Sequence, residues 1–195
     1  MRHALVSKTL CGVIEPAVRV VADRIFVLTG GRAGSKKHKP TIASFYETGL
    51  VVAIYEFLLM SPALAHLEIR HEMPYAGTTR PEQVDLWIRP PTGGYAHLIE
   101  AGDFAPGKVK NDAAKMRRLN PRGSNWFLAF FRDSPHSADP WAKIQDCRRR
   151  RGSLKFARLE FDKRMTASFT IRLPGVNDVA FGYALIGVKQ IRRGV

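Results

Sequence analysis

Hydrophobic and polar residues alternate in two successive segments near the middle of the chain, and a helical pattern follows them. From Glu82 to Arg89 apolar residues occupy every second position, which is typical of a β-strand. Pro90 to Gly94 ends that strand in a turn, because proline lacks a ladder donor and glycine permits positive φ. Tyr95 to Gly102 predicts a second strand, and the spacing of apolar residues from Lys108 to Leu119 predicts a helix.

The same patterns predict elements on either side. Ile42 to Met60 carries apolar residues at helical spacing. Trp126 to Phe131 is a nearly continuous apolar run, typical of a strand buried on both faces of a sheet. The other expected elements are a helix and then a strand within residues 3–28 (the strand at Ile25–Leu28), a strand at Leu67–Met73, a helix at Asp139–Arg151, a hairpin of Leu154–Phe161 and Ala167–Leu173 around Asp162-Lys163-Arg164, and a last strand or helix at Ala180–Ile191.

Length and composition limit the possible folds. The chain has 195 residues, of which 45% are hydrophobic, enough to bury the core of one globular domain. The order of strands and helices predicts an α/β (α+β) domain with a central mixed sheet of four to six strands flanked by helices. We expect the helices at Ile42–Met60 and Lys108–Leu119 to cover one face of that sheet.

Charge is distributed unevenly along a basic chain. The formal net charge is +14, which favours a polyanionic partner such as nucleic acid. Residues 41–103 nevertheless hold eight acidic residues and three Lys or Arg, whereas the segments on both sides are basic. This distribution suits a cation site within a polyanion-binding surface, and ordinary solvated faces of either sign are the alternative explanation.

Other residue types exclude several classes of protein. Cys11 and Cys147 are isolated, without a CxxC or Cys/His cluster, so we expect no structural zinc and a reducing compartment. The six histidines show no HExxH or paired ligand spacing. No GxSxG or Cys/His dyad signature occurs, so a hydrolase with a protein nucleophile has no support. No apolar run reaches the length of a membrane span and no signal peptide is apparent. We therefore expect a cytoplasmic protein with no membrane partner.

A glycine-rich basic segment runs from Thr29 to Pro40. It suggests a phosphate-binding P-loop, but its lysine pair is out of register with the last glycine and no Ser or Thr follows the pair. We interpret it as a flexible basic loop in which Lys36, Lys37 and Lys39 contact phosphates without taking part in chemistry.

Two carboxylates on neighbouring strands are the main indication of chemistry. Asp85 lies near the middle of the first predicted strand and Glu100 near the end of the second, so the two are expected to meet on one sheet surface. Converging carboxylates are costly unless a cation lies between them. Glu47 interrupts the apolar pattern of the preceding helix, where an exposed position on the helix flank is the ordinary explanation.

The predicted order of a helix, three strands, a helix and a strand resembles the core of the restriction-endonuclease-like superfamily, the PD-(D/E)xK nucleases. The resemblance covers residues 41–132. Val84-Asp85 stands at the family's Pro-Asp position, and Glu100-Ala101-Gly102 stands at its (D/E)-x-K position. The superfamily often adds a glutamate from the preceding helix, and Glu47 matches that role.

One departure from the family concerns catalysis. Gly102 occupies the place of the motif lysine, which is therefore absent there. In parts of the superfamily this lysine has moved to the next helix, which makes Lys108 and Lys115 candidates. Lys115 is narrowly favoured, because a helix antiparallel to its strand brings it back beside the middle of the sheet. Contact with phosphate or solvent is the alternative for both lysines.

The resemblance implies a DNA endonuclease that hydrolyses phosphodiester bonds with Mg²⁺, or with Mn²⁺ as the alternative metal. The expected metal ligands are the carboxylates of Asp85 and Glu100 and the carbonyl of Ala101. The expected catalytic side chains are those of Glu47, Asp85, Glu100, Lys108 and Lys115. If the missing lysine has abolished the chemistry, the chain is instead a non-catalytic nucleic-acid-binding protein with a degenerate nuclease fold. A basic protein-interaction module would leave the acidic pair unexplained.

Arginines outside the predicted strands are the expected contacts to the DNA backbone, which they would hold without reading its sequence. They are Arg117, Arg118, Arg122, Arg148, Arg149, Arg150 and Arg151. For the run 148–151, cations that stabilise a helix C-terminus are an equally good explanation.

The resemblance also organises the whole chain. A single domain would consist of the nuclease-like core, a basic N-terminal extension of residues 1–40 and a C-terminal extension of residues 133–195. A homodimer would let one active site serve each DNA strand. A restriction, defence or mobile-element system is the expected context.

Overall fold

The computed structural model describes residues 2–28, 47–74, 83–132, 137–149, 159–171 and 179–188. Four α-helices, one short 3₁₀ helix and six strands lie in this part of the chain. They are α1 (Arg2–Leu28), α2 (Glu47–Leu59), η3 (Pro62–Leu64), β1 (Glu68–Pro74), β2 (Gln83–Arg89), β3 (His97–Asp103), α3 (Pro106–Leu119), β4 (Ser124–Arg132), α4 (Pro140–Arg149), β5 (Leu159–Ile171) and β6 (Val179–Val188). No described helix has the length and apolar character needed to span a membrane.

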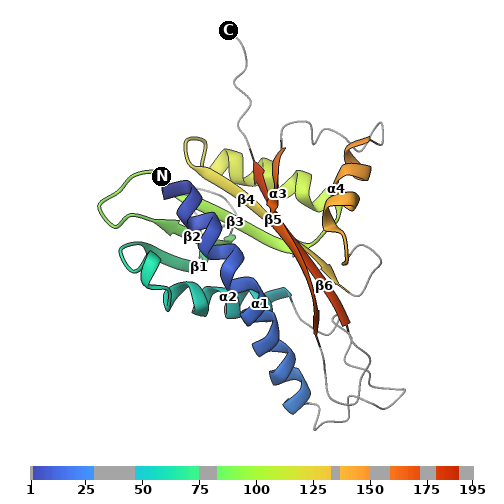
Figure 1. Ribbon diagram of the computed structural model, residues 1–195. Coiled ribbons are helices and arrows are strands. Elements are labelled where there is room, and N and C mark those ends of the chain that lie inside the picture. Colours follow the sequence, from blue (N-terminus) through green and yellow to red (C-terminus); the bar gives the residue numbers. More distant parts are fainter. Residues whose placement is uncertain are drawn as a thin grey trace.

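The six strands form one mixed sheet in the order β1-β2-β3-β4-β6-β5. Only β3 and β4 are parallel, and α3 connects them, whereas every other neighbouring pair is antiparallel. A parallel pair needs such a crossover, because a tight turn reverses the chain direction. The predicted α/β fold with a central mixed sheet is confirmed, and Figure 1 shows α1 crossing in front of the sheet with α3 behind it.

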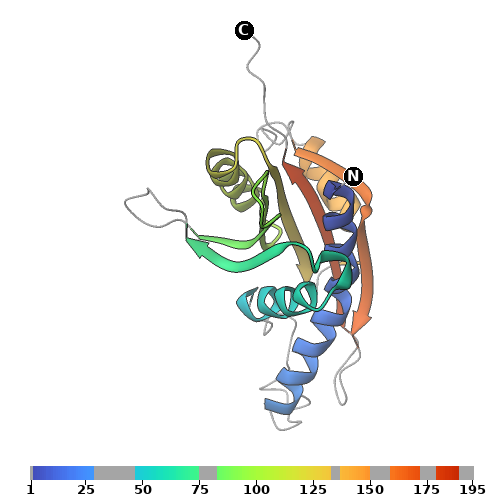
Figure 2. The same ribbon diagram turned by 90° about the vertical axis from the view of Figure 1, so that its left-hand side faces the viewer.

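Helices cover both faces of the sheet. On one face α1 and α2 pack against residues that include Leu86, Ile99 and Leu128, and on the other α3 and α4 pack against residues that include Leu98 and Phe127. Figure 2 shows α3 on the opposite side of the sheet from α1 and α2. The strand β4 is buried on both sides, as its apolar run predicted.

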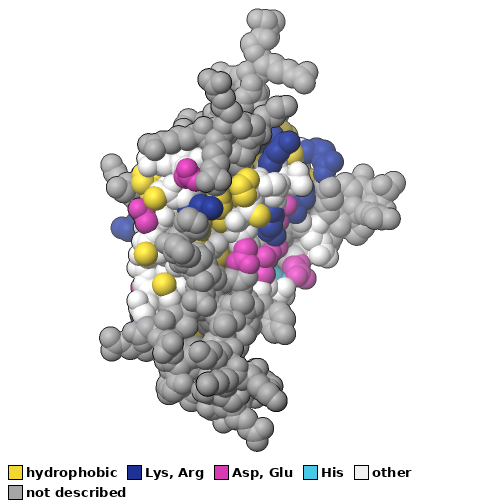
Figure 3. All heavy atoms as spheres, turned by 90° about the vertical axis from the view of Figure 1, so that its right-hand side faces the viewer, with side chains coloured by type: hydrophobic (Ala, Val, Ile, Leu, Met, Phe, Trp, Pro, Cys, Tyr) yellow, Lys and Arg dark blue, Asp and Glu magenta, His cyan; other side chains and the backbone are white. Residues whose placement is uncertain are grey.

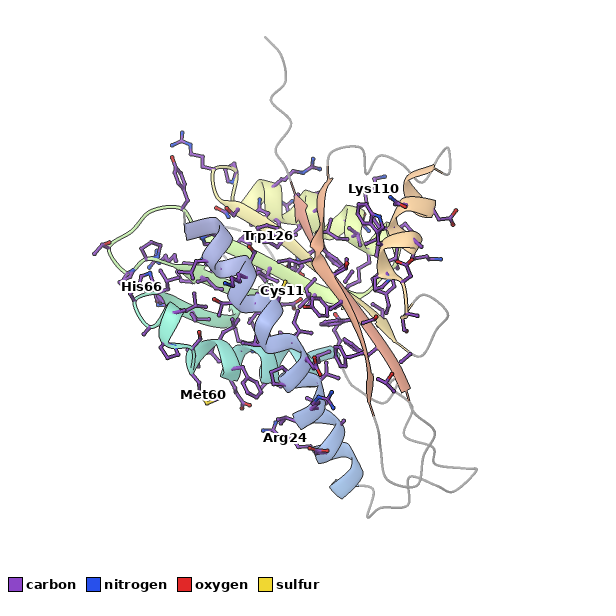
Figure 4. All side chains as sticks on the ribbon, viewed as in Figure 1. Cys11, Arg24, Met60, His66, Lys110 and Trp126 are labelled. Atoms are coloured by element: carbon purple, nitrogen blue, oxygen red, sulfur yellow. The ribbon has the colours of Figure 1, made fainter. Side chains whose placement is uncertain are left out.

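The expectation that α2 and α3 share one face is wrong. The helix α2 is apolar on nearly every side and packs beside α1 in the core of the same sheet face. Arg24 near the end of α1 also reaches α2, where its Nη2 lies 3.5 Å from Oε2 of Glu56 (Figure 4). Helical periodicity reports that a helix has a buried side, but it does not report which sheet face receives that side.

Two local predictions are also wrong. The helix and strand expected within residues 3–28 are one helix, α1, which continues past Pro16 and includes the supposed strand at residues 25–28. The hairpin expected around residues 162–164 is one strand, β5, whose pairing with β6 is irregular between Phe161 and Thr166. The charged residues that suggested a turn therefore lie within an irregular stretch of an edge strand.

The remaining predictions are confirmed as far as the described residues reach. The predicted helix 42–60 appears as α2, the helix 139–151 as α4, and the segment 180–191 as the strand β6. Residues 42–46, 150–151, 154–158, 172–173 and 189–191 of the predicted elements lie outside the described part.

Candidate active site

The carboxylates lie where β2 and β3 separate. Residues 86–88 of β2 pair with residues 97–99 of β3, whereas β3 stays paired with β4 as far as Asp103. Next to this paired stretch, a side chain replaces the backbone hydrogen bonds between β2 and β3. Oδ2 of Asp85 accepts a 2.7 Å hydrogen bond from the backbone N–H of Ala101. Burial raises the pKa of Asp85, the hydrogen bond from Ala101 opposes that rise, and the charge of Glu47 adds to it.

Glu100 precedes Ala101 in β3 and is almost fully buried. Its side chain is 5% exposed, and Nζ of Lys115 on α3 lies 2.6 Å from its Oε1. Burial and the neighbouring charge of Asp85 raise the pKa of Glu100 to about 7, although Lys115 opposes the rise. Lys115 also donates a 3.1 Å hydrogen bond to the carbonyl of Gln83. This lysine therefore connects α3 to both strands that border the opening.

Glu47 and Lys108 form a second ion pair near these carboxylates. Nζ of Lys108, in the first turn of α3, donates a 2.9 Å hydrogen bond to Oε1 of Glu47 in the first turn of α2. The two helices pack on opposite faces of the sheet, so this pair joins them beside the end of β3. Burial lowers the pKa of Lys108, but the bond to Glu47 and the charges of Asp112 and Asp85 outweigh it and the pKa is raised. The ammonium therefore stays charged.

Gly102 makes room for this second pair. Its φ of +153° is a conformation that residues with a side chain rarely adopt. A Cβ at this position would collide with Cε of Lys108, and it would lie 2.9 Å from Nζ of Lys108 and 2.7 Å from Oε2 of Glu47. The ammonium of Lys108 thus occupies the space into which any side chain at position 102 would extend.

Asp112 belongs to the site, although the sequence analysis assigned it no role. Its Oδ1 lies 3.9 Å from Nζ of Lys115, and its Oδ2 lies 3.9 Å from Nζ of Lys108. Burial raises the pKa of Asp112, and the two lysines partly offset that rise. The signal that predicts this arrangement is the spacing of positions 108, 112 and 115, because residues at i, i+4 and i+7 share one face of a helix.

Four carboxylates and two ammonium groups thus form one cluster, which we call the carboxylate–lysine cluster. Its members are Glu47, Asp85, Glu100, Asp112, Lys108 and Lys115. Figure 3 shows a face of the molecule on which acidic side chains gather beside Lys and Arg side chains. All five predicted catalytic side chains lie in this cluster.

The cluster offers oxygen ligands for a hard cation. Oε1 of Glu100 and Oδ2 of Asp112 are buried and accept no hydrogen bond from the described residues. The ammonium of Lys115 lies 2.6 Å from the first oxygen and neutralises its charge. The N–H and C=O of one residue in an extended strand point to the same side, so the carbonyl of Ala101 faces the opening beside Asp85.

The number of protein ligands for a metal would be small. The described residues contain no group of three or more His, Cys, Asp and Glu side chains arranged to hold a metal ion. Mg²⁺ usually keeps several waters and takes one or two carboxylates from the protein. The carboxylates of Asp85 and Glu100, the carbonyl of Ala101 and water fit that requirement.

The predicted DNA contacts are only partly described. Arg118 and Arg122 are exposed, and Nε of Arg117 donates to the carbonyl of Ala113. Positions 108 and 118 of α3 are separated by about 15 Å along the helix axis at ~1.5 Å per residue, so these arginines stand well away from the carboxylates. Arg148 and Arg149 end α4, and their side chains are not described. The other predicted contacts lie outside the described residues, and they are Lys36, Lys37, Lys39, Arg150 and Arg151.

Comparison with known proteins gives no relative. No protein-family model matches the chain, and no curated protein or solved structure is significantly similar to it.

Proposed function

We propose that this chain is a metal-dependent phosphodiester hydrolase that cleaves DNA and has a restriction-endonuclease-like core. The element order α2-β1-β2-β3-α3-β4, with β3 and β4 parallel, supports the proposal because it is the order expected for that core. The basic composition of the chain supports a polyanionic substrate.

The observation that carries the proposal is the pair Asp85 and Glu100 at the opening between β2 and β3. The charge of Asp85 contributes to the raised pKa of Glu100, so the two carboxylates are close enough to interact. Burying acidic groups side by side lowers stability, and groups with perturbed pKa values are concentrated at functional sites. A cation site explains why the chain keeps both groups at a place where two strands separate.

Each side chain has a distinct task in this proposal. Asp85, Glu100 and the carbonyl of Ala101 would hold Mg²⁺. The bound metal would supply an activated water and neutralise charge that develops on the phosphate. Lys115 favours the ionised form of Glu100, which is the form that binds a cation. Lys108 would stabilise negative charge on the reacting phosphate.

The position of Lys108 beside Gly102 favours it for the role of the missing motif lysine. A lysine at position 102 would extend from the space that the Lys108 ammonium occupies, and Glu47 holds that ammonium in place. The sequence favoured Lys115 narrowly, but Lys115 is engaged by Glu100 and by the carbonyl of Gln83. We therefore assign the charge-stabilising role to Lys108 and a positioning role to Lys115.

A nucleic-acid-binding protein without cleavage activity is the second candidate function. The observation that favours it is that both lysines already neutralise carboxylates within the cluster. In that case the ion pairs would hold α2 and α3 against the sheet, and the basic surface would bind nucleic acid on its own.

Plasmid cleavage in the presence of Mg²⁺ or Mn²⁺ distinguishes the two functions. We expect nicked or linear DNA from the wild-type protein, and none from Asp85→Asn or Glu100→Gln. Glu56→Gln is the matched control, because Glu56 is an exposed glutamate of α2 in an ion pair with Arg24. DNA binding without cleavage under either metal would support the second function, and full activity in the two site variants would exclude this site.

A further inference from the structure

A second charged cluster lies on the sheet along β2, starting two residues beyond Asp85. Residues 85, 87 and 89 project from β2 to one side, and Trp87 packs there with residues of the core under α3. The register places Arg70 of β1 opposite Trp87. Cζ of Arg89 lies 4.5 Å from the centroid of the Trp87 ring system, and Cζ of Arg70 lies 5.6 Å from it. Two guanidinium groups therefore cover one buried indole.

Glu68 holds both of these arginines. It lies opposite Arg89 in the strand register, its Oε2 accepts a 3.1 Å hydrogen bond from Nε of Arg89, and its Oε1 is ion-paired with Nη2 of Arg70. The carboxylate of Glu68 therefore contacts two guanidinium groups. Among the described residues, the terminal Nη groups of Arg89 have no acceptor.

The exposure and the geometry of the two arginines suit them to bind an anion. The side chains of Arg70 and Arg89 are 47% and 39% exposed, although Trp87 beneath them is buried. An arginine stacked on an aromatic ring is fixed in orientation, and the edge of its planar guanidinium matches the oxygens of a phosphate group. Asp85 and Arg89 are four residues apart, about 13 Å at ~3.3 Å per residue in a strand, which is within reach of neighbouring phosphates on one strand.

The basic end of α3 lies at the same end of the sheet as Arg89. Because Ile88 pairs with His97, Arg89 lies next to Ala96, the last residue of the turn between β2 and β3. Asn120, at the end of α3, donates a 3.0 Å hydrogen bond to the carbonyl of Ala96. Positive charge from two separate elements therefore gathers at the end of β2 that is remote from Asp85.

We propose that Arg70 and Arg89, stacked on Trp87, form a phosphate-binding surface that takes the sugar–phosphate backbone of a nucleic acid leading away from the carboxylate–lysine cluster. The inference rests on the proposed function for the identity of the polyanion. Glu68 occupies the guanidinium edges in the free protein, and a phosphate group replaces it when nucleic acid binds. Glu68 is consequently an internal competitor of the phosphate group for the two arginines.

The competitor makes the proposal testable by a gain of affinity. Binding of a labelled DNA duplex is measured by fluorescence anisotropy at several salt concentrations, with EDTA present to prevent cleavage. Glu68→Gln should tighten binding at least threefold, because it removes the carboxylate that both arginines contact. Arg89→Ala should weaken binding and flatten the slope of log K against log salt by about 0.9, because the variant neutralises one phosphate fewer. Arg89→Lys keeps the charge but loses the planar fork, so it should also weaken binding.

The chain contains a matched control pair. Glu15 and Arg19 form an exposed ion pair on α1, which covers the other face of the sheet. Glu15→Gln and Arg19→Ala change the net charge by the same amounts as the variants of Glu68 and Arg89, and they should leave the affinity within twofold of the wild-type value.

Three results would overturn the inference. Equal tightening by Glu68→Gln and Glu15→Gln would mean that only net charge matters. Wild-type affinity in both variants of Arg89 would mean that the surface does not contact DNA. Either result leaves the proposed cleavage site intact, because cleavage depends on other residues. Failure of the wild-type protein to bind DNA at low salt would overturn this inference and the proposed substrate together.

Discussion

Replacing the buried carboxyl group of Glu100 by an amide should remove the effect of pH on stability at this site. The folded-state pKa is about 7 and the ordinary value is 4.5. Between these values the folded protein keeps a proton that the unfolded chain has released, so stability from this group is fully present below pH 4.5 and is lost as pH rises through 7. The difference between these two pKa values, at ~1.36 kcal/mol for each pKa unit, corresponds to a change of about 3 kcal/mol in the free energy of unfolding.

Glu100→Gln keeps the shape of the side chain and removes its titration. The stability of the variant relative to the wild-type protein should therefore increase by about 3 kcal/mol between pH 4.5 and pH 8. Urea denaturation at both pH values measures the difference, which corresponds to a relative shift of about 1.5 M in midpoint at a slope of ~2 kcal/mol per M. Glu56→Gln controls for loss of an exposed glutamate.

Parallel pH profiles for the wild-type protein and Glu100→Gln would refute this reasoning. They would mean that the carboxyl group ionises in the folded protein as easily as in the unfolded chain. Burial against α3 would then impose no electrostatic cost, and a main reason for regarding this position as a cation site would disappear.

Three further predictions concern the same cluster. Gly102→Ala should lower stability by roughly 1–3 kcal/mol through backbone strain and displacement of Lys108, as measured by thermal denaturation. Gly107→Ala should leave stability unchanged, because a Cβ at position 107 meets nothing within 4 Å. Equal effects of the two substitutions would contradict the crowding at Gly102. In single-turnover cleavage, Lys108→Ala should lower the rate and leave the DNA affinity unchanged. Lys110 is an exposed lysine of the same helix (Figure 4), and Lys110→Ala should keep the full rate. A full rate in Lys108→Ala would reassign the charge-stabilising role to Lys115. Mg²⁺ should raise the thermal midpoint more at pH 8 than at pH 6, because a carboxyl that titrates near pH 7 must lose its proton to bind metal; a pH-independent increase would place the metal elsewhere.

The sequence predicted most of the strands and helices because their periodicity is local. Alternation over residues 82–89 and the apolar run 126–131 each reflect which sides of a strand are buried, and the structure has β2 and β4 there. The face that each helix covers depends instead on contacts between distant segments, and the packing of α2 beside α1 on one sheet face left no periodic signal. The charged triplet 162–164 suggested a turn because composition alone does not distinguish a hairpin from an edge-strand bulge.

The candidate site was predictable to the extent that it depends on neighbouring strands. Asp85 and Glu100 follow from a hairpin with a short turn, and the structure connects them through Ala101. The lack of room for a side chain at position 102 beside Lys108 depends on a positive φ and on the path of a loop, neither of which the sequence specifies. The stacking of Arg70 on Trp87 requires the register of β1 against β2, and the pattern of either strand alone contains no information about that register.

The packing of α1 has a consequence for how the chain folds during synthesis. Leu10 and Ile14 of α1 belong to the same core as Phe181 and Leu185 of β6, and the hydroxyl of Tyr183 donates a hydrogen bond to the carbonyl of Cys11 across 172 positions of sequence. The ribosome delivers α1 before β6, so the part of α1 that packs on β6 stays uncovered while the segments between them are synthesised. We therefore expect α1 to need protection from aggregation until β6 joins the sheet.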